Sequence, residues 1–157
     1  MEILQIGLDH KSAPIALREQ LSLTASDIPD ALGALCSHNG HEISSVDEAA
    51  ILSTCNRLEL YEVVQDPRRA YQAALERLVQ TTGVSAEMLR THLTTRRDEE
   101  AVAHLCEVAC GLDSMVLGES QIQGQVSQAH ELALVNGTAG AVINALFRGA
   151  VHAGKRA

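Results

Sequence analysis

The spacing of apolar residues predicts short strands in the first two thirds of the chain and helices in the last third. Alternating or continuous apolar runs predict strands at residues 2–8, 48–54 and 58–64, and a weaker one within 89–95. Apolar residues three and four apart predict helices. These helices span residues 15–21, 27–38, 68–82, 98–110, 120–136 and 141–154. The pattern therefore predicts a small sheet with packed helices.

A short polar connection lies between the second and third predicted strands, in the stretch LSTCNRLELY. Its shortness predicts that the two strands are antiparallel neighbours. Thr54, Cys55, Asn56 and Arg57 occupy the connection, so a thiol lies beside a hydroxyl, an amide and a guanidinium. A nearby cation increases the thiolate fraction of a cysteine, which makes Cys55 a candidate nucleophile. A buried cysteine at a strand end is the alternative interpretation.

Composition and charge narrow the class of protein. The 157 residues are 46% hydrophobic but only 2% aromatic, which predicts one aliphatic core. The formal net charge of −8 argues against a broad phosphate-binding surface, and the arginine pairs at 68–69 and 96–97 are interpreted as solvated surface. Four cysteines without a C-x-x-C pair, no secretion signal and no membrane-length apolar run predict a cytoplasmic protein with reduced thiols.

Two further groups of polar residues are candidates for chemistry. Cys106 and Cys110 lie one helical turn apart near His104, but a fourth ligand is missing, so we predict small core residues and no metal site. His104 is either a helix-boundary residue or the proton partner of an attacking cysteine. The stretch 111–129 gathers hydroxyl, carboxylate and amide groups around a glycine-broken helix entry, where they would suit an amino-acid ligand. A capped surface helix is the alternative. The group comprises Ser114, Glu119, Ser120, Gln121 and Gln125.

Four long stretches together resemble the N-terminal part of the glutamyl-tRNA reductase family. They are GLDHKSAPIALRE, LSTCNRLELY, AVAHLCEVACGLDSMVLGESQIQGQVSQA and LFRGAVHAGKR. The resemblance implies an α+β fold with a ferredoxin-like antiparallel sheet, packed helices and a helical C-terminal third. It also implies a catalytic domain at residues 1–140 and a truncated start of the family's linking helix at 141–157.

The resemblance also implies a reaction. The family's cysteine attacks the ester of glutamyl-tRNA to form a thioester, which NADPH reduces to glutamate-1-semialdehyde in the first committed step of five-carbon tetrapyrrole biosynthesis. Cys55 matches the nucleophile and His104 a histidine important for activity. The matching substrate-binding positions are Thr54, Cys55, Asn56, Arg57, Ser114, Glu119, Ser120, Gln121 and Gln125.

The cofactor and partners follow from the same resemblance. No G-x-G-x-x-G or P-loop pattern occurs in these residues, so NADPH is expected to bind a domain of the full-length enzyme that is absent here. The isolated domain is then expected to perform acyl transfer and slow ester hydrolysis only. Glutamyl-tRNA is the expected substrate, and the implied partners are a second copy of the full-length enzyme and the downstream aminomutase. The alternative function is a non-catalytic regulatory or partner-binding module on the same fold.

Overall fold

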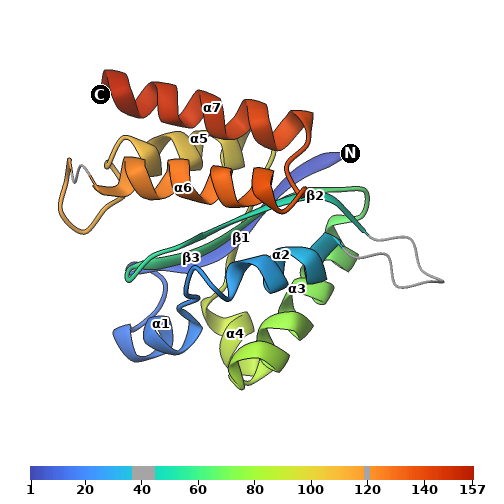
Figure 1. Cartoon of the computed structure of the whole chain (residues 1–157). Coiled ribbons are helices and arrows are strands. Elements are labelled where there is room, and N and C mark those ends of the chain that lie inside the picture. The colour runs from blue at the N-terminus through green and yellow to red at the C-terminus, as the bar shows by residue number, and fades with distance from the viewer. Residues whose placement is uncertain (37–44, 119–120) are drawn as a thin grey trace.

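A four-stranded antiparallel sheet in the order β2-β3-β1-β4 forms the centre of the molecule (Figure 1). The computed structural model describes residues 1–36, 45–118 and 121–157. Its strands are β1 (Glu2–Asp9), β2 (Val46–Ser53), β3 (Arg57–Val64) and β4 (Thr94–Arg97). Helices separate β1 from β2 and β3 from β4, which is the ferredoxin-like β-α-β-β-α-β arrangement. The predicted α+β fold is therefore confirmed.

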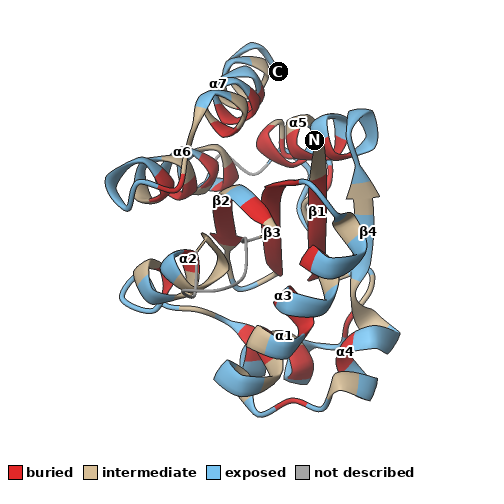
Figure 2. Ribbon diagram, turned by 90° about the vertical axis from the view of Figure 1, so that its right-hand side faces the viewer, coloured by how far each residue is buried: buried red, intermediate tan, exposed pale blue. Residues whose placement is uncertain are grey.

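Helices cover both faces of the sheet. Within the described ranges they are α1 (Ile15–Leu21), α2 (Ile28–Cys36), α3 (Pro67–Thr82), α4 (Ala86–His92), α5 (Glu99–Ala109), α6 (Gln121–Val135) and α7 (Ala141–Arg156). The helices α1 to α4 lie against one face, and α5 to α7 lie against the other (Figures 1 and 2). None of the helices in these ranges is long and apolar enough to cross a membrane.

The position of β3 as one of the two inner strands explains why charged side chains are buried in this protein. It pairs with β2 from Ser53↔Leu58 to Val46↔Val64, which confirms the predicted antiparallel hairpin. It also pairs with β1 along its whole length. With a strand on each side and a helical layer on each face, all eight residues of β3 are buried (Figure 2).

Two apolar cores lie on the two faces. The α1–α4 face is filled almost entirely by aliphatic residues such as Leu21, Leu32 and Leu75. The opposite face contains Tyr61 and Phe147, whose rings meet edge to face with centroids 5.5 Å apart. The protein therefore has two mainly aliphatic cores, one on each face of the sheet, instead of the single core that was predicted.

One predicted element is wrong in type. Residues 89–95 were predicted as a strand, but Leu89 to His92 belong to α4, and β4 begins only at Thr94. The helix is started by Ser85, whose hydroxyl accepts a hydrogen bond from the Met88 N–H at 3.2 Å. This N-cap determines the local structure, because the segment is too short for apolar spacing to distinguish helix from strand. The first residue of the predicted helix at 120–136 and the end of the predicted helix at 27–38 lie outside the described residues.

The last helix is held by a carboxylate from the edge strand. Glu48 of β2 accepts hydrogen bonds from the N–H groups of Gly140, Val142 and Ile143 at 3.0, 3.3 and 2.8 Å. The first N–H groups of a helix have no partner within the helix, so this carboxylate supplies one. Helix α7 also contributes Ile143, Leu146 and Phe147 to the core on its face. The predicted domain boundary at residue 140 stays a prediction.

Candidate active site

The turn between β2 and β3 presents Cys55 to solvent. Two hydrogen bonds close the turn: the Thr54 N–H donates to the Arg57 carbonyl oxygen at 2.9 Å, and the Asn56 N–H donates to the Thr54 hydroxyl at 3.2 Å. Local side-chain bonds of this kind are a standard way for threonine to stabilise a turn. Cys55 is exposed between these bonded residues. The alternative of a buried cysteine at a strand end is therefore wrong.

The other three cysteines are less accessible. Cys36, Cys106 and Cys110 are all half-buried. Burial, and secondly the negative charge of nearby carboxylates, raises the pKa of the Cys36 thiol to about 11. Burial also raises the pKa of Cys106, which packs against the core as predicted. In the described part of the chain, no group of three His, Cys, Asp or Glu residues could hold a metal ion.

The polar side of the turn is tied to α1. Arg18 donates from Nη1 to the Asn56 side-chain oxygen at 3.1 Å and from Nε to the Ala13 carbonyl at 3.2 Å. The second bond orients the guanidinium, and the first then holds the Asn56 amide. Arg18 is therefore a cation beside the thiol-bearing turn, and its place there was not predicted from the sequence.

Arg57 points into the protein, because it occupies the first position of the buried strand β3. Its side chain is only 2% exposed, and its Nη1 lies 3.0 Å from Glu59 Oε1 and 3.2 Å from Asp113 Oδ2. Its Nη2 donates to the Asp113 carbonyl at 2.7 Å. The Arg57 guanidinium, which the family resemblance implied as a substrate-binding group, therefore binds two carboxylates of the protein in this structure.

Glu59 lies at the centre of this buried polar cluster. Its carboxylate accepts hydrogen bonds from Arg57, from His104 Nε2 at 2.6 Å and from the Tyr61 hydroxyl at 2.5 Å. Burial alone would raise the pKa of Glu59, but the bonds and charges of His104, Arg57 and Tyr61 outweigh burial and lower it. Burial, and secondly the negative charge of Glu59, raises the pKa of Tyr61 well above its ordinary range. Glu59 is therefore an ionised acceptor with three donors.

His104 reaches the thiol-bearing turn through this cluster. The histidine lies on α5 and is 4% exposed. Among the described residues it makes no hydrogen bond to Cys55. Its Nε2 bonds instead to Glu59, which also accepts a hydrogen bond from Arg57, two residues after the thiol. The structure thus brings His104 and Arg57 together around Glu59 and leaves the thiol outside this cluster.

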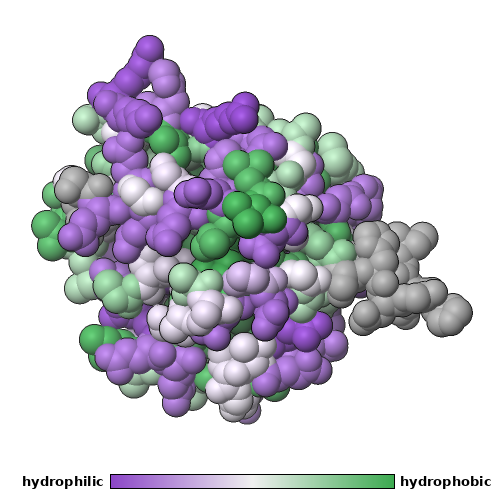
Figure 3. Space-filling model, viewed as in Figure 1, coloured by the Kyte–Doolittle hydropathy of each residue, from purple (hydrophilic) through white to green (hydrophobic). Residues whose placement is uncertain are grey.

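The loop after α5 is anchored to the same cluster by Asp113. Besides binding Arg57, Asp113 accepts from the Lys11 ammonium at 2.5 Å. Burial would raise the pKa of Asp113, but the bonds and charges of Lys11 and Arg57 lower it. Around this anchor, Ser114 is half-buried and four large apolar side chains are exposed. They are Leu112, Met115, Val116 and Leu117. Apolar side chains are visible at the left edge of Figure 3, where Figure 1 places this loop.

The remaining predicted residues lie on or just before α6. Gln125 lines a small crevice of about 110 Å³ together with Ser53, the last residue of β2, which places it near the turn. Gln121 is exposed at the first position of α6. Glu119 and Ser120 lie outside the described residues.

Sequence reasoning missed four residues of the site: Lys11, Arg18, Glu59 and Asp113. Glu59 left a signal, because it is one of two glutamates inside the mostly apolar run of β3. The other three lie within the stretches that carried the family resemblance, but their spacing in the sequence does not reveal their contacts. Lys11 and Asp113 are separated by 102 positions.

The fold and the turn together define a ferredoxin-like α+β domain that exposes a cysteine above a buried ionic cluster. The family profile described as "Glutamyl-tRNAGlu reductase, N-terminal domain" matches residues 6–157. The chain belongs to this family.

Individual relatives agree with this assignment. The chain is 42% identical over 156 residues to a glutamyl-tRNA reductase of Trichodesmium erythraeum. The alignment covers 99% of this chain and 35% of that protein. The chain is equally 42% identical to a glutamyl-tRNA reductase of Corynebacterium aurimucosum, covering 33% of it. The solved glutamyl-tRNA reductase from Methanopyrus kandleri superposes with a TM-score of 0.74 at 27% identity, over 98% of this chain and 33% of that one. The chain thus spans about a third of the length of these relatives.

Proposed function

We propose that this chain is the catalytic domain of a glutamyl-tRNA reductase and that Cys55 accepts the glutamyl group. The exposure of Cys55 at the tip of a hydrogen-bonded turn is the observation that carries the proposal. The Cys55 thiolate attacks the ester carbonyl, its sulfur bonds to the acyl carbon, and the bond to the tRNA ribose oxygen breaks. The ribose oxygen takes up a proton, and the tRNA is released. The glutamyl group remains bound to Cys55 as a thioester.

The reduction step requires a hydride donor. A dinucleotide cradle of the Rossmann type needs parallel strands joined by a helix, whereas all pairs in this sheet are antiparallel. We therefore propose that NADPH, which supplies the hydride, binds a part of the full-length enzyme outside these 157 residues. The full-length reaction would yield glutamate-1-semialdehyde for tetrapyrrole synthesis, with a homodimer and the downstream aminomutase as proposed partners.

The proposed glutamyl site surrounds the turn. Thr54, Asn56 and Gln125 offer hydroxyl and amide groups near the thiol. Ser114 lies in the loop after α5 and Gln121 at the first position of α6. Glu119 and Ser120 complete the proposed set. Arg57 would act mainly by holding Asp113 and the turn in place, because its guanidinium is buried. Lys11, whose side chain is 62% exposed, is the cation of this cluster that a substrate carboxylate can approach.

His104 acts in this proposal as a positioning residue. Its bond to Glu59 fixes the carboxylate that holds Arg57, and Arg57 forms the end of the turn. In His104→Gln an amide N–H can replace the Nε2 donor, so acylation should be largely retained, whereas His104→Ala should slow it. If His104 instead delivered a proton to the ribose oxygen, glutamine would fail as badly as alanine. The measurement is the rate of Cys55 acylation under single-turnover conditions.

Intact-mass analysis after mixing with glutamyl-tRNA tests the main proposal. A glutamyl adduct that is removed by hydroxylamine is expected on the wild type and on the control Cys110→Ala, but not on Cys55→Ala. An adduct that persists in Cys55→Ala, or no adduct on a wild type whose fold is confirmed by circular dichroism, contradicts the proposal. Retained tRNA binding without any adduct would favour the alternative of a non-catalytic binding module.

A further inference from the structure

Positive charge is concentrated in one part of this acidic chain. Residues 66–97 contain six of the twelve Lys and Arg residues but only three of the twenty Asp and Glu residues. This segment therefore has a net charge of +3, while the other 125 residues carry −11. It forms the edge strand β4 and the helices α3 and α4 on one face of the sheet (Figure 2). A polyanion near this protein would be attracted to that unit and repelled elsewhere.

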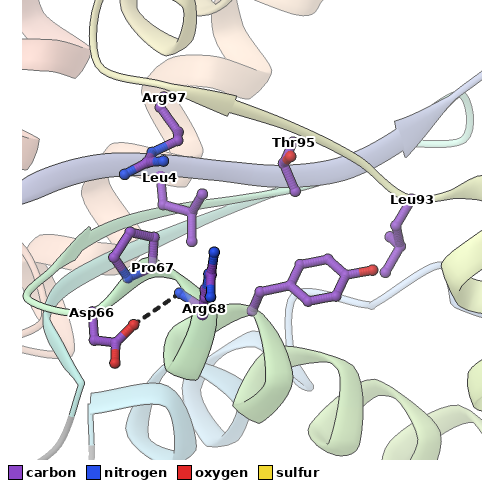
Figure 4. A pocket seen from close by; sticks show the side chains of 8 residues that line it. Leu4, Asp66, Pro67, Arg68, Leu93, Thr95 and Arg97 are labelled. Carbon is purple, nitrogen blue, oxygen red and sulfur yellow. Dashed lines mark hydrogen bonds between the residues drawn. The ribbon is translucent and has the colours of Figure 1, made fainter.

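An open pocket of about 560 Å³ lies within this basic unit, between the start of α3 and the β1–β4 edge. Arg68 extends from α3 toward Leu4 of β1, and Thr95 and Arg97 of β4 lie on the opposite wall (Figure 4). The β1–β4 register pairs Leu4 with Arg97, so both side chains project from the same face of the sheet. Tyr71 adds an aromatic ring to the lining. One arginine from each predicted surface pair thus lines the same pocket.

The charges in the pocket differ in how far they are neutralised. Arg97 is paired with Glu2, and Asp66 directs its carboxylate to the N–H groups of α3, including that of Arg68 at 3.0 Å. The exposed Arg68 guanidinium has neither an ion pair nor a side-chain hydrogen bond within the described residues. The available groups are therefore a free guanidinium, a tyrosine ring and a threonine hydroxyl. A guanidinium binds two phosphate oxygens at once, and a flat ring accepts a stacked base or sugar.

We propose that this pocket binds the sugar-phosphate backbone of the tRNA, with Arg68 on a phosphate group. The inference rests on the proposed function, in which the aminoacylated end of the tRNA lies at Cys55. The strand β3 runs from the thiol-bearing turn toward the start of α3, so the pocket lies roughly 25 Å from Cys55. The stem of an RNA whose end is held at the thiol can reach that far. The α1 helix that holds Asn56 also lies on this face of the sheet.

Binding of a fluorescent tRNA(Glu) transcript to the chain, measured by anisotropy at several KCl concentrations, tests the pocket. Arg68→Ala should weaken binding about threefold to tenfold and reduce the slope of log K against log salt by about one. Arg148→Ala is the matched control, because it removes the same charge from an exposed position on α7. It should change the affinity less than about twofold. Equal effects of the two variants would overturn the proposal, since only overall charge would then matter.

Acylation of Cys55 separates this inference from the proposed function. With subsaturating glutamyl-tRNA, Arg68→Ala should slow acylation by the same factor as it weakens binding. With glutamyl-adenosine, which has the ester but no RNA stem, the variant and the wild type should react equally. A slower reaction with both substrates would contradict the pocket proposal. If neither substrate acylates the wild type, the proposed function fails, while the anisotropy measurement still decides whether the pocket binds RNA.

Discussion

Replacing Glu62 by glutamine should stabilise the protein above neutral pH and leave its stability near pH 5 almost unchanged. Glu62 lies in the middle of β3 between Ala49 of β2 and Leu4 of β1, on the face covered by α1 to α4. It is fully buried, and within the described residues neither carboxylate oxygen has a hydrogen-bond partner. Burial therefore raises the pKa of Glu62 from 4.5 to about 8. The folded protein holds the carboxyl in its neutral form at physiological pH.

The direction and size of the effect follow from this pKa. Between about pH 4.5 and pH 8 the folded state keeps a proton on Glu62 that the unfolded state releases, so stability falls as the pH rises through this window. A difference of one pKa unit corresponds to about 1.4 kcal/mol. The cost in unfolding free energy is then roughly 3 kcal/mol at pH 7 and roughly 4–5 kcal/mol above pH 8. Glutamine resembles the neutral carboxylic acid in shape and does not ionise, so it avoids this cost.

Urea unfolding of the wild type and Glu62→Gln at pH 5, 6, 7 and 8 measures the effect. Other titrating groups are common to both proteins and cancel in the difference, which should widen by about 1.4 kcal/mol per pH unit above pH 5. The control Glu131→Gln changes an exposed glutamate on α6 and should give a flat difference. If the difference for Glu62→Gln were equally flat, the carboxyl would be ionised and solvated in the folded state, and the reasoning from its burial would be refuted.

Three further predictions concern the turn and the packing of the sheet. A substoichiometric amount of iodoacetamide at pH 7 should label Cys55 before the other three cysteines, as peptide mapping would show. Gly7→Ala should destabilise the fold by about 1–3 kcal/mol in thermal or urea unfolding, because its Cβ would lie 2.5 Å from a backbone oxygen of β3. In the control Gly149→Ala, the added Cβ in α7 meets open space, so this variant should stabilise the fold by about 0.5–1 kcal/mol. Glu48→Gln should accelerate hydrogen exchange in the first turn of α7, whereas Asp47→Asn should not.

The sequence allowed the hairpin to be predicted because it depends on local signals, whereas the same signals left open whether Cys55 is exposed or buried. Two apolar runs flank a short polar stretch around Cys55, and this pattern is sufficient for an antiparallel pair. Helix α4 was missed because it is seven residues long and its start depends on one capping serine. The inward orientation of Arg57 was missed because it depends on β3 being an inner strand. Strand order is set by contacts between distant segments, which apolar spacing does not reveal.

The two buried glutamates of β3 point to opposite faces of the sheet, and their carboxyl groups differ in charge and in hydrogen bonding. Glu59 faces α5 to α7 and has three donors, whereas Glu62 faces the aliphatic core and has no donor in the part of the chain that the structure describes. Removing one partner from a buried ionic cluster leaves the others uncompensated, and this typically costs about 3–5 kcal/mol. Glu59→Leu should therefore destabilise the protein and disturb the Cys55 turn through Arg57. Replacing Glu62 by glutamine should instead add stability above neutral pH and leave the site unchanged, so the ionised carboxylate that this strand needs is the one beneath the thiol.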